Sequence, residues 1–366
     1  MTGDDMADRM TSSERFQAVL RGDKPDRVPV FGFALGYAAY ATGLPLARFF
    51  TEPRASLEAQ LRARDQHGYD DGPSFAWADY GSWEFGGEIA IPRTYEAGAP
   101  MTTRPPVETL SDVGRLKVPD PRRAGSVPLV IEFGHAAVAA GFDVAFRAGT
   151  PTLLVGSMAG KARLLRWYLT EPSAVEALYD KATEFLLRTI EVMVNEFGAD
   201  HVSANIGAPL DSNDLISPRL FERFAVPHQR RVNERLISLG VRSVFLHLCG
   251  DQRGNLAAWS SLPWPPRCIV SVGEDADLIE VAEAFGHQHV TAGNVSTALL
   301  AHGKPDEITE ACRSCIRRYG DLPAGFILMP ACDMPVMTPL PNVDAMVEAA
   351  RRFGRTHAPS RRIVPG

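Results

Sequence analysis

Cysteine is scarce in this sequence, with five residues among 366. So small and odd a number does not make a disulfide framework, and it fits a reducing cytoplasm best. Apolar runs of eighteen or more residues are missing, as is a charged start followed by an apolar stretch. The sequence therefore predicts neither a membrane span nor an export signal. No basic stretch carries interleaved aromatic residues, which argues against a nucleic-acid partner.

Apolar residues, in contrast, are plentiful. They make up 45% of the chain, enough for a large core, and the net charge of −6 arises from acidic and basic residues mixed along it. Short, continuous apolar runs alternate with long amphipathic stretches, as in parallel sheets whose strands are buried on both faces. Eight such runs joined by helices predict an α/β protein with a (β/α)8 TIM-barrel fold. The predicted strands are 27–33, 73–79, 152–156, 201–206, 242–247, 267–272, 289–293 and 325–331.

The pattern predicts a single barrel domain over residues 13–356. Residues 1–12 are polar and are expected to be disordered, and residues 357–366 are expected to form a tail. Residues 80–140 are irregular and rich in glycine and proline. We expect them to form an insertion after the second strand, with a hairpin and loops over the barrel mouth. A doubly wound open sheet is the alternative, but the sequence has no nucleotide-binding fingerprint to support it.

Two potential metal ligands stand one residue apart where the fifth predicted strand ends. His247 and Cys249 occupy positions i and i+2 of an extended chain, so their side chains point the same way. Cys332 follows the eighth strand, and a barrel gathers the carboxyl ends of its strands at one mouth. Two cysteines and a histidine with an open fourth position form a known arrangement of catalytic zinc. On spacing alone, ordinary buried thiols remain the alternative.

Polar residues follow three other predicted strands at the same mouth. Glu84 can serve as a fourth zinc ligand that substrate displaces or as a general acid, and Asp79 can contact a polar edge of the substrate. Turn chemistry is the competing explanation, because Asn, Asp, Ser and Gly gather in loops for backbone reasons. An apolar segment, "FALGYAAY", follows the first predicted strand. The candidate substrate-binding residues are Tyr37, Trp83, Asn205, Asp211, Asn213 and Asn294.

Several motifs give the chain a resemblance to a known family. They are "SSERFQAVLRGDKPDRVPV", "LISPRLFERFAVPHQRRV", "VFLHLCG", "TAGNVS" and "MPACDMPVMTPLPNV", and they span nearly all of residues 12–353. The chain resembles the uroporphyrinogen decarboxylase superfamily, and most closely its corrinoid methyltransferase branch. That branch includes the methylcobalamin:coenzyme M methyltransferases and the zinc-dependent O-demethylases. The resemblance implies that His247, Cys249 and Cys332 are zinc ligands.

The function that this resemblance implies is methyl transfer. A zinc-dependent enzyme of this kind moves a methyl group between a substrate heteroatom, in a thiol or a methoxy-type donor, and the cobalt of a corrinoid. The sequence contains no Asp-x-His-x-x-Gly motif, so a separate corrinoid-binding protein is the expected partner. The small-molecule donor or acceptor stays unnamed. The oligomeric state is open, with a homodimer as one option.

Two other functions compete with methyl transfer. The first is a metal-free decarboxylase acting on a tetrapyrrole or a smaller acid, with Asp79 as the catalytic carboxylate. True uroporphyrinogen decarboxylases carry arginines after the first strand, whereas "FGFALGYAAYATG" in this chain has none, so a tetra-anionic substrate would lose its charge partners. The second is a non-catalytic binding protein in which zinc is a structural clip.

Overall fold

The computed structural model describes residues 8–77 and 79–355. The predicted tail, residues 357–366, and most of the predicted disordered start lie outside these residues. Residues 8–11 are held against the domain, because the amides of Arg9 and Met10 donate hydrogen bonds to Asp26.

A six-stranded parallel sheet forms the centre of the molecule, with its strands hydrogen-bonded in chain order. Every residue of β6 and β8 is buried, as expected for strands covered on both faces. The α/β class with a parallel sheet is confirmed. The strands of this sheet are β3 (Val144–Arg147), β4 (Val202–Gly207), β5 (Ser243–Leu248), β6 (Ile269–Val272), β7 (Val290–Val295) and β8 (Phe326–Pro330).

The first two predicted strands, 27–33 and 73–79, flank the two edges of this sheet. Each makes one isolated parallel bridge in place of a full ladder. Two carboxylates replace part of that ladder, since the buried Asp70 accepts the amide of Val30 and the half-buried Asp71 accepts the amide of Gly32. Both segments occupy the places of the first and second strands of a (β/α)8 barrel. The bridges join Val30 to Leu328 of β8 and Ser74 to Ala145 of β3.

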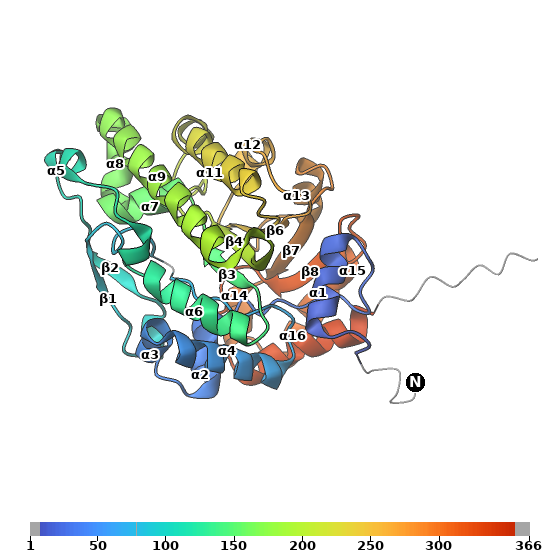
Figure 1. The fold of residues 1–366 in the computed structure, drawn as a ribbon. Coiled ribbons are helices and arrows are strands. Elements are labelled where there is room, and N and C mark those ends of the chain that lie inside the picture. Colours follow the sequence, from blue (N-terminus) through green and yellow to red (C-terminus); the bar gives the residue numbers. More distant parts are fainter. Residues whose placement is uncertain (1–7, 78, 356–366) are drawn as a thin grey trace, which may run out of the picture.

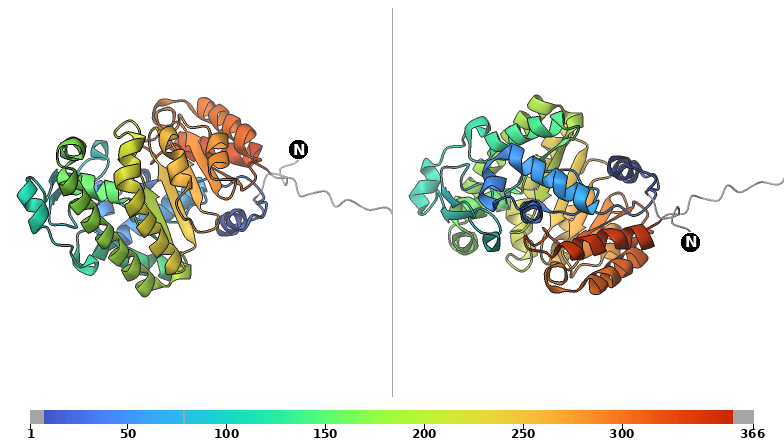
Figure 2. Two further views of the ribbon diagram at one scale, coloured as in Figure 1. Left: turned by 90° about the horizontal axis from the view of Figure 1, so that it is seen from above. Right: turned by 90° about the horizontal axis from the view of Figure 1, so that it is seen from below.

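Helices surround the sheet on its outside (Figures 1 and 2). None of those in the described part of the chain has the length and apolar character needed to cross a membrane. The long α9 contacts both β4 and α11, as an outer barrel helix should. The longer helices are α1 (Ser12–Arg21), α2 (Leu35–Thr42), α4 (Pro53–His67), α6 (Val127–Ala139), α7 (Pro151–Ala159), α8 (Lys161–Thr170), α9 (Pro172–Phe197), α11 (Val226–Ser238), α15 (Pro305–Tyr319) and α16 (Leu340–Phe353). The shorter ones are α3 (Leu46–Thr51), α5 (Leu110–Arg115), α10 (Pro218–Leu220), α12 (Leu256–Ser260), α13 (Leu278–Ala284) and α14 (Thr297–His302).

The predicted strand at 152–156 is wrong, because this segment lies inside α7. All nine residues of α7 are buried, so its sequence shows no polar face that would mark a helix. Thr150 caps the helix by accepting the amide of Leu153, and Pro151 occupies its first turn. The third strand is β3, eight residues earlier in the chain.

The segment 80–140 contains both the expected hairpin and an unexpected helix. The antiparallel strands β1 (Glu88–Ala90) and β2 (Met101–Arg104) form the hairpin. The helix α6 ends the segment and contacts both β3 and α4, so it belongs to the outer layer of the barrel. Figure 1 shows the hairpin and α1 at opposite ends of the molecule.

The helix α1 covers the end of the barrel opposite the carboxyl ends of the strands. Val19 of α1 joins a separate apolar cluster with Phe31, Ile327 and other residues of the barrel interior. This helix begins with a capping box between Thr11 and Glu14. The interior of the barrel is therefore packed and closed at this end, which leaves the opposite mouth for a site.

Candidate metal centre

Three ligand side chains meet at the carboxyl-end mouth of the barrel. His247 is the fifth residue of β5, Cys249 follows that strand directly, and Cys332 follows β8. Their ligand atoms all lie within 4.8 Å of one another. Among the described residues, this group contains no carboxylate. The donors that the sequence singled out are thus brought together by the fold.

The imidazole of His247 is oriented for a ligand at Nε2. Its Nδ1 lies 2.8 Å from the hydroxyl of Ser271, the residue that pairs with His247 across β5 and β6. Its Nε2 is buried and has no hydrogen-bond partner in the described structure. A buried polar atom without a partner is costly. A metal ion at Nε2, with the other ring nitrogen held by a hydrogen bond, satisfies it.

Each of the thiols of Cys249 and Cys332 shifts the pKa of the other. Cys249 donates a hydrogen bond to Cys332, which lowers the pKa of Cys332, and His247 acts in the same direction. The same contact, together with burial, raises the pKa of Cys249. The group thus already favours one thiolate, the form in which cysteine binds metals. Two thiolates and a neutral imidazole fit Zn²⁺ by charge and by donor type.

Removing the hydroxyl of Ser271 should weaken metal binding without abolishing it. We expect Ser271→Ala to lower zinc affinity by about 10–100-fold, because the imidazole loses the partner that fixes its orientation. Competition with a zinc-binding dye measures this change. An affinity equal to that of the wild type would show that Ser271 does not position the ligand.

Aromatic rings enclose the histidine on the side facing the barrel interior. The ring of Phe245 stacks on that of His247, with centroids 6.3 Å apart and planes 2° apart. Phe33 meets the same imidazole edge-on at 5.4 Å. These rings keep water away from the base of the site and lower the local dielectric constant, which strengthens charge interactions there.

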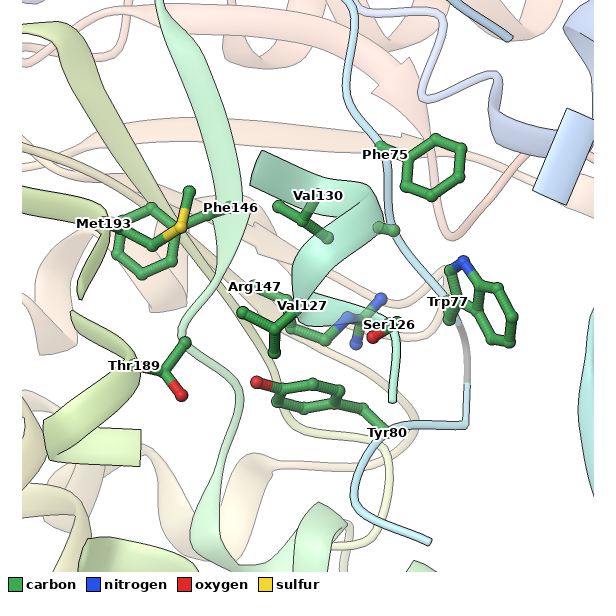
Figure 3. Close-up of a pocket in the computed structure, with 11 residues that line it drawn as sticks. Phe75, Trp77, Tyr80, Ser126, Val127, Val130, Phe146, Arg147, Thr189 and Met193 are labelled. Atoms are coloured by element: carbon green, nitrogen blue, oxygen red, sulfur yellow. The ribbon is translucent and has the colours of Figure 1, made fainter. Parts of the chain in front are cut away.

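Arg147, which no sequence pattern singles out, lies at the carboxyl end of a neighbouring strand. It is the last residue of β3 and pairs with Asn205 of β4. Its Nε is buried without a hydrogen-bond partner in the described structure. Arg147 lines a pocket beside Tyr80 and Trp77 (Figure 3). Its place at the end of a strand is the available signal, but the sequence pattern predicts the third strand at 152–156 instead of at β3.

Glu84 accepts hydrogen bonds that link its own loop to the start of α6. Its Oε2 accepts the amide of Gly81, and its Oε1 accepts both the amide and the hydroxyl of Ser126. Burial raises the pKa of Glu84, while these hydrogen bonds oppose the rise. Oε1 is therefore engaged at the N-terminus of α6 and Oε2 at Gly81, and the expected roles as zinc ligand or general acid gain no support from this placement.

Asp79 and Trp83 are also held by neighbouring parts of the mouth. Asp79 accepts hydrogen bonds from the hydroxyl of Ser157 in α7 and the amide of Thr102 in β2. Burial alone would raise the pKa of Asp79, but these hydrogen bonds outweigh it and lower the pKa. Trp83 stacks on Trp77 at 4.9 Å, and Trp77 lines the pocket of Arg147.

Asp211 is fully buried beside α7. Its Oδ2 accepts the hydroxyl of Thr150, while its Oδ1 has no partner among the described residues. Burial raises the pKa of Asp211 to about 6. A substrate contact through Oδ1 stays a prediction.

The raised pKa of Asp211 should be visible in the pH dependence of stability. Because the folded state binds this proton more tightly than the unfolded state, stability is lost as pH rises from about 4 to about 6. Asp211→Asn should remove up to about 3 kcal/mol of this loss. Urea unfolding at pH 4 and pH 7 measures it, with exposed Glu58→Gln as the control. The expectation fails if the difference in unfolding free energy between Asp211→Asn and the wild type is the same at pH 4 and at pH 7.

The three candidate asparagines have different surroundings. Asn205 lies on β4 between Arg147 and Phe245, close to the metal group. Asn213 bonds to Asn255 and to the amide of Gly254, which joins two loops. Asn294 donates to three carbonyls of the loop after β6. The side chains of Asn213 and Asn294 are thus engaged in loop contacts, and substrate binding by the three asparagines stays a prediction.

Tyr37 directs its hydroxyl towards a neighbouring helix. It is fully buried in α2, and its hydroxyl lies 2.8 Å from Nε2 of His67 in α4. That imidazole in turn contacts Asp344 of α16. The polar atom of Tyr37 thus helps to join three outer helices, and its contact with substrate stays a prediction.

Two named proteins are similar to this chain in sequence. The methylcobamide:CoM methyltransferase MtbA of Methanosarcina acetivorans is 29% identical over 210 residues, 55% of this chain and 58% of that protein. The match therefore spans little more than half of that relative's length. A uroporphyrinogen decarboxylase of Anaeromyxobacter dehalogenans is 25% identical over 361 residues, 93% of this chain and 99% of that protein.

The fold has a solved counterpart. A methyltransferase from Methanosarcina mazei shares it with a TM-score of 0.78 and 24% identity, over 94% of this chain and 99% of that one. The family described as uroporphyrinogen decarboxylase (URO-D) matches residues 11–353, nearly the whole described chain. The chain belongs to the uroporphyrinogen decarboxylase family.

Proposed function

We propose that this chain is a zinc-dependent methyltransferase that moves a methyl group between a substrate heteroatom and the cobalt of a corrinoid held by a partner protein. The observation that carries the proposal is the buried, unpartnered Nε2 of His247 in a group with the thiols of Cys249 and Cys332. Three protein ligands leave a fourth position for the substrate. Similarity to methylcobamide:CoM methyltransferases supports the corrinoid as the other participant.

Each residue of the site has a defined part in this proposal. Zinc bound here would favour the thiolate form of a substrate thiol or polarise a methoxy-type oxygen. His247, Cys249 and Cys332 would hold the ion, and the two cysteines would balance its charge. Both must lose their thiol protons, so metal binding should tighten as pH rises. Ser271 fixes the imidazole, and the aromatic rings exclude water.

A metal-free decarboxylase that uses Asp79 is less well supported. The carboxylate of Asp79 is occupied by Ser157 and Thr102, and its pKa is lowered. Its hydrogen bonds fasten α7 to the β1–β2 hairpin, which is a structural task. No observation on the metal group favours this alternative.

Spectroscopy of free corrinoids tests the proposal. Zinc-loaded protein is mixed with methylcobalamin and thiol acceptors, and in separate reactions with reduced cobalamin and methyl thioethers or aromatic methyl ethers. We expect the cobalamin spectrum to change with multiple turnovers in at least one direction, and the change to stop when zinc is chelated. Absence of turnover in both directions, or turnover that survives chelation, would contradict the proposal.

A further inference from the structure

Phe33 has a backbone conformation that bulky residues rarely adopt. Its φ is +43°, in the left-handed region that favours glycine. Three non-glycine residues of the described chain lie in this region, and the other two, Arg267 and His287, precede β6 and β7 at the opposite end of the barrel. Phe33 alone of the three lies at the carboxyl-end mouth, and strained residues of this kind gather at functional sites.

A carboxylate holds this strained turn on one side. Oδ1 of Asp71 accepts the amide of Gly32 at 2.7 Å, and Oδ2 accepts the amide of Phe33 at 3.1 Å. One side chain thus binds two successive amides, at the point where the chain enters the left-handed region. Hydrogen bonds to a carboxylate are stronger than those between neutral groups, so the amide of Phe33 is firmly placed.

The loop that carries Cys332 holds the turn on the other side. The amide of Met334 donates to the carbonyl of Phe33 at 3.0 Å. The amide of Leu35 donates to the carboxylate of Asp333 at 3.4 Å. Asp333 and Met334 follow Cys332 directly in the chain. The position of the turn and the position of this thiol are therefore linked through the backbone.

The side chain of Phe33 lies against a second member of the metal group. Its ring meets the imidazole of His247 with centroids 5.4 Å apart and planes at 69°, a favourable edge-to-face arrangement. The same ring meets Phe245 at 5.5 Å. While Asp71 holds the amide of Phe33, a relaxed, negative φ would turn the Cα–Cβ bond in another direction. The left-handed conformation is therefore what places the ring on His247.

We propose that Phe33 is a positioning residue for the metal group. Its strained backbone, fixed between Asp71 and the loop of Cys332, sets the imidazole of His247 and the thiol of Cys332 at the spacing that a metal ion needs. Strain of this kind is kept where it prepares a site in advance of its ligand. The inference rests on the metal site of the proposed function and is independent of methyl transfer.

Metal binding by matched variants tests this proposal. Phe33→Leu removes the ring and keeps an apolar side chain, and Phe31→Leu makes the same change two residues earlier. Phe31 is buried, and its ring packs against Phe16 and Phe245. We expect Phe33→Leu to lower the zinc affinity about tenfold and to shift the visible absorption bands of protein loaded with Co²⁺. Phe31→Leu should change neither.

A double variant separates positioning from general support of the fold. Asp71→Asn loosens the turn, because the side-chain oxygen of asparagine replaces only one of the two accepting oxygens. It should lower the zinc affinity roughly threefold, less than the loss of a direct neighbour. Because both residues act through the same ring, Phe33→Leu combined with Asp71→Asn should bind zinc as Phe33→Leu does. Circular dichroism confirms that each variant is folded.

Several results would overturn the proposal. Equal zinc affinity of Phe33→Leu and the wild type would do so, as would an equal loss in Phe33→Leu and Phe31→Leu. If Phe33→Leu does not fold, a weakened zinc affinity and a shifted Co²⁺ spectrum in Asp71→Asn support the proposal, and an unchanged affinity and spectrum contradict it. A wild type that binds neither metal contradicts this inference and the proposed function together, whereas metal binding that depends on Phe33 without methyl transfer contradicts the proposed function alone.

Discussion

Cys332→Ser should purify with much less than one zinc per chain and lose at least about 100-fold of its methyl-transfer rate. A serine hydroxyl keeps its proton near neutral pH and is a poor ligand for zinc, whereas the thiolate of Cys332 completes the group with His247 and Cys249. Loss of a partner behind a ligand already costs about 10–100-fold, so loss of a ligand should cost more. Elemental analysis gives the zinc content, and the cobalamin spectrum gives the rate.

A second cysteine provides the control for this prediction. Cys315 of α15 is half-buried like Cys332 but lies outside the metal group. Cys315→Ser should therefore keep full zinc content and rate. If Cys332→Ser retains both as well, the group does not hold a catalytic ion.

Asp70→Ala should destabilise the fold by about 3–5 kcal/mol, the range for breaking a buried ion pair. Asp70 accepts hydrogen bonds from Arg15 of α1 at 2.6 Å and from Arg27 of the first strand segment at 2.8 Å. It also accepts the amide of Val30. All three charged side chains are at most 1% exposed, so the substitution leaves two cations buried with fewer partners. Urea denaturation measures the change.

The matched comparison is an exposed ion pair. Glu310 of α15 contacts Arg313 at 2.8 Å, and both side chains are at least half exposed. Glu310→Ala should cost no more than about 0.5 kcal/mol. Asp70→Asn keeps the size of the side chain. Its loss of unfolding free energy should lie between the losses for Asp70→Ala and Glu310→Ala. A loss for Asp70→Ala below about 1 kcal/mol would mean that the network at the base of the barrel does not hold α1 in place.

The strands β6 and β8 could be predicted from the sequence because every residue in them is buried, and β7 because all but one are. The segments 201–206, 242–247, 267–272, 289–293 and 325–331 each overlap a strand of the sheet. The third strand could not be found in this way. β3 has only four residues and ends in Arg147, whereas α7 is apolar throughout. The length of this segment, the cap at Thr150 and Pro151 in the first turn all indicate a helix. Its continuous apolar character nevertheless favoured the prediction of a buried strand.

The grouping of His247, Cys249 and Cys332 was also predictable, because their chemistry is rare in this sequence and their positions at strand ends constrain where they point. Arg147 was not, since a single arginine in a chain with many carries no pattern. Its Nε is buried without a hydrogen-bond partner among the described residues, which only the packed structure reveals. Glu84, Asn213 and Asn294 stand out in the sequence instead. In the structure their polar atoms form hydrogen bonds with the surrounding loops.

X-ray absorption at the zinc edge of the freshly purified protein tests the central claim most directly. The account predicts one zinc per chain, with two sulfur neighbours and one imidazole nitrogen, and loss of one sulfur neighbour in any zinc that Cys332→Ser still holds. Protein that contains no zinc after growth in zinc-supplemented medium, or zinc surrounded by oxygen and nitrogen alone, would contradict the assignment of His247, Cys249 and Cys332 as its ligands.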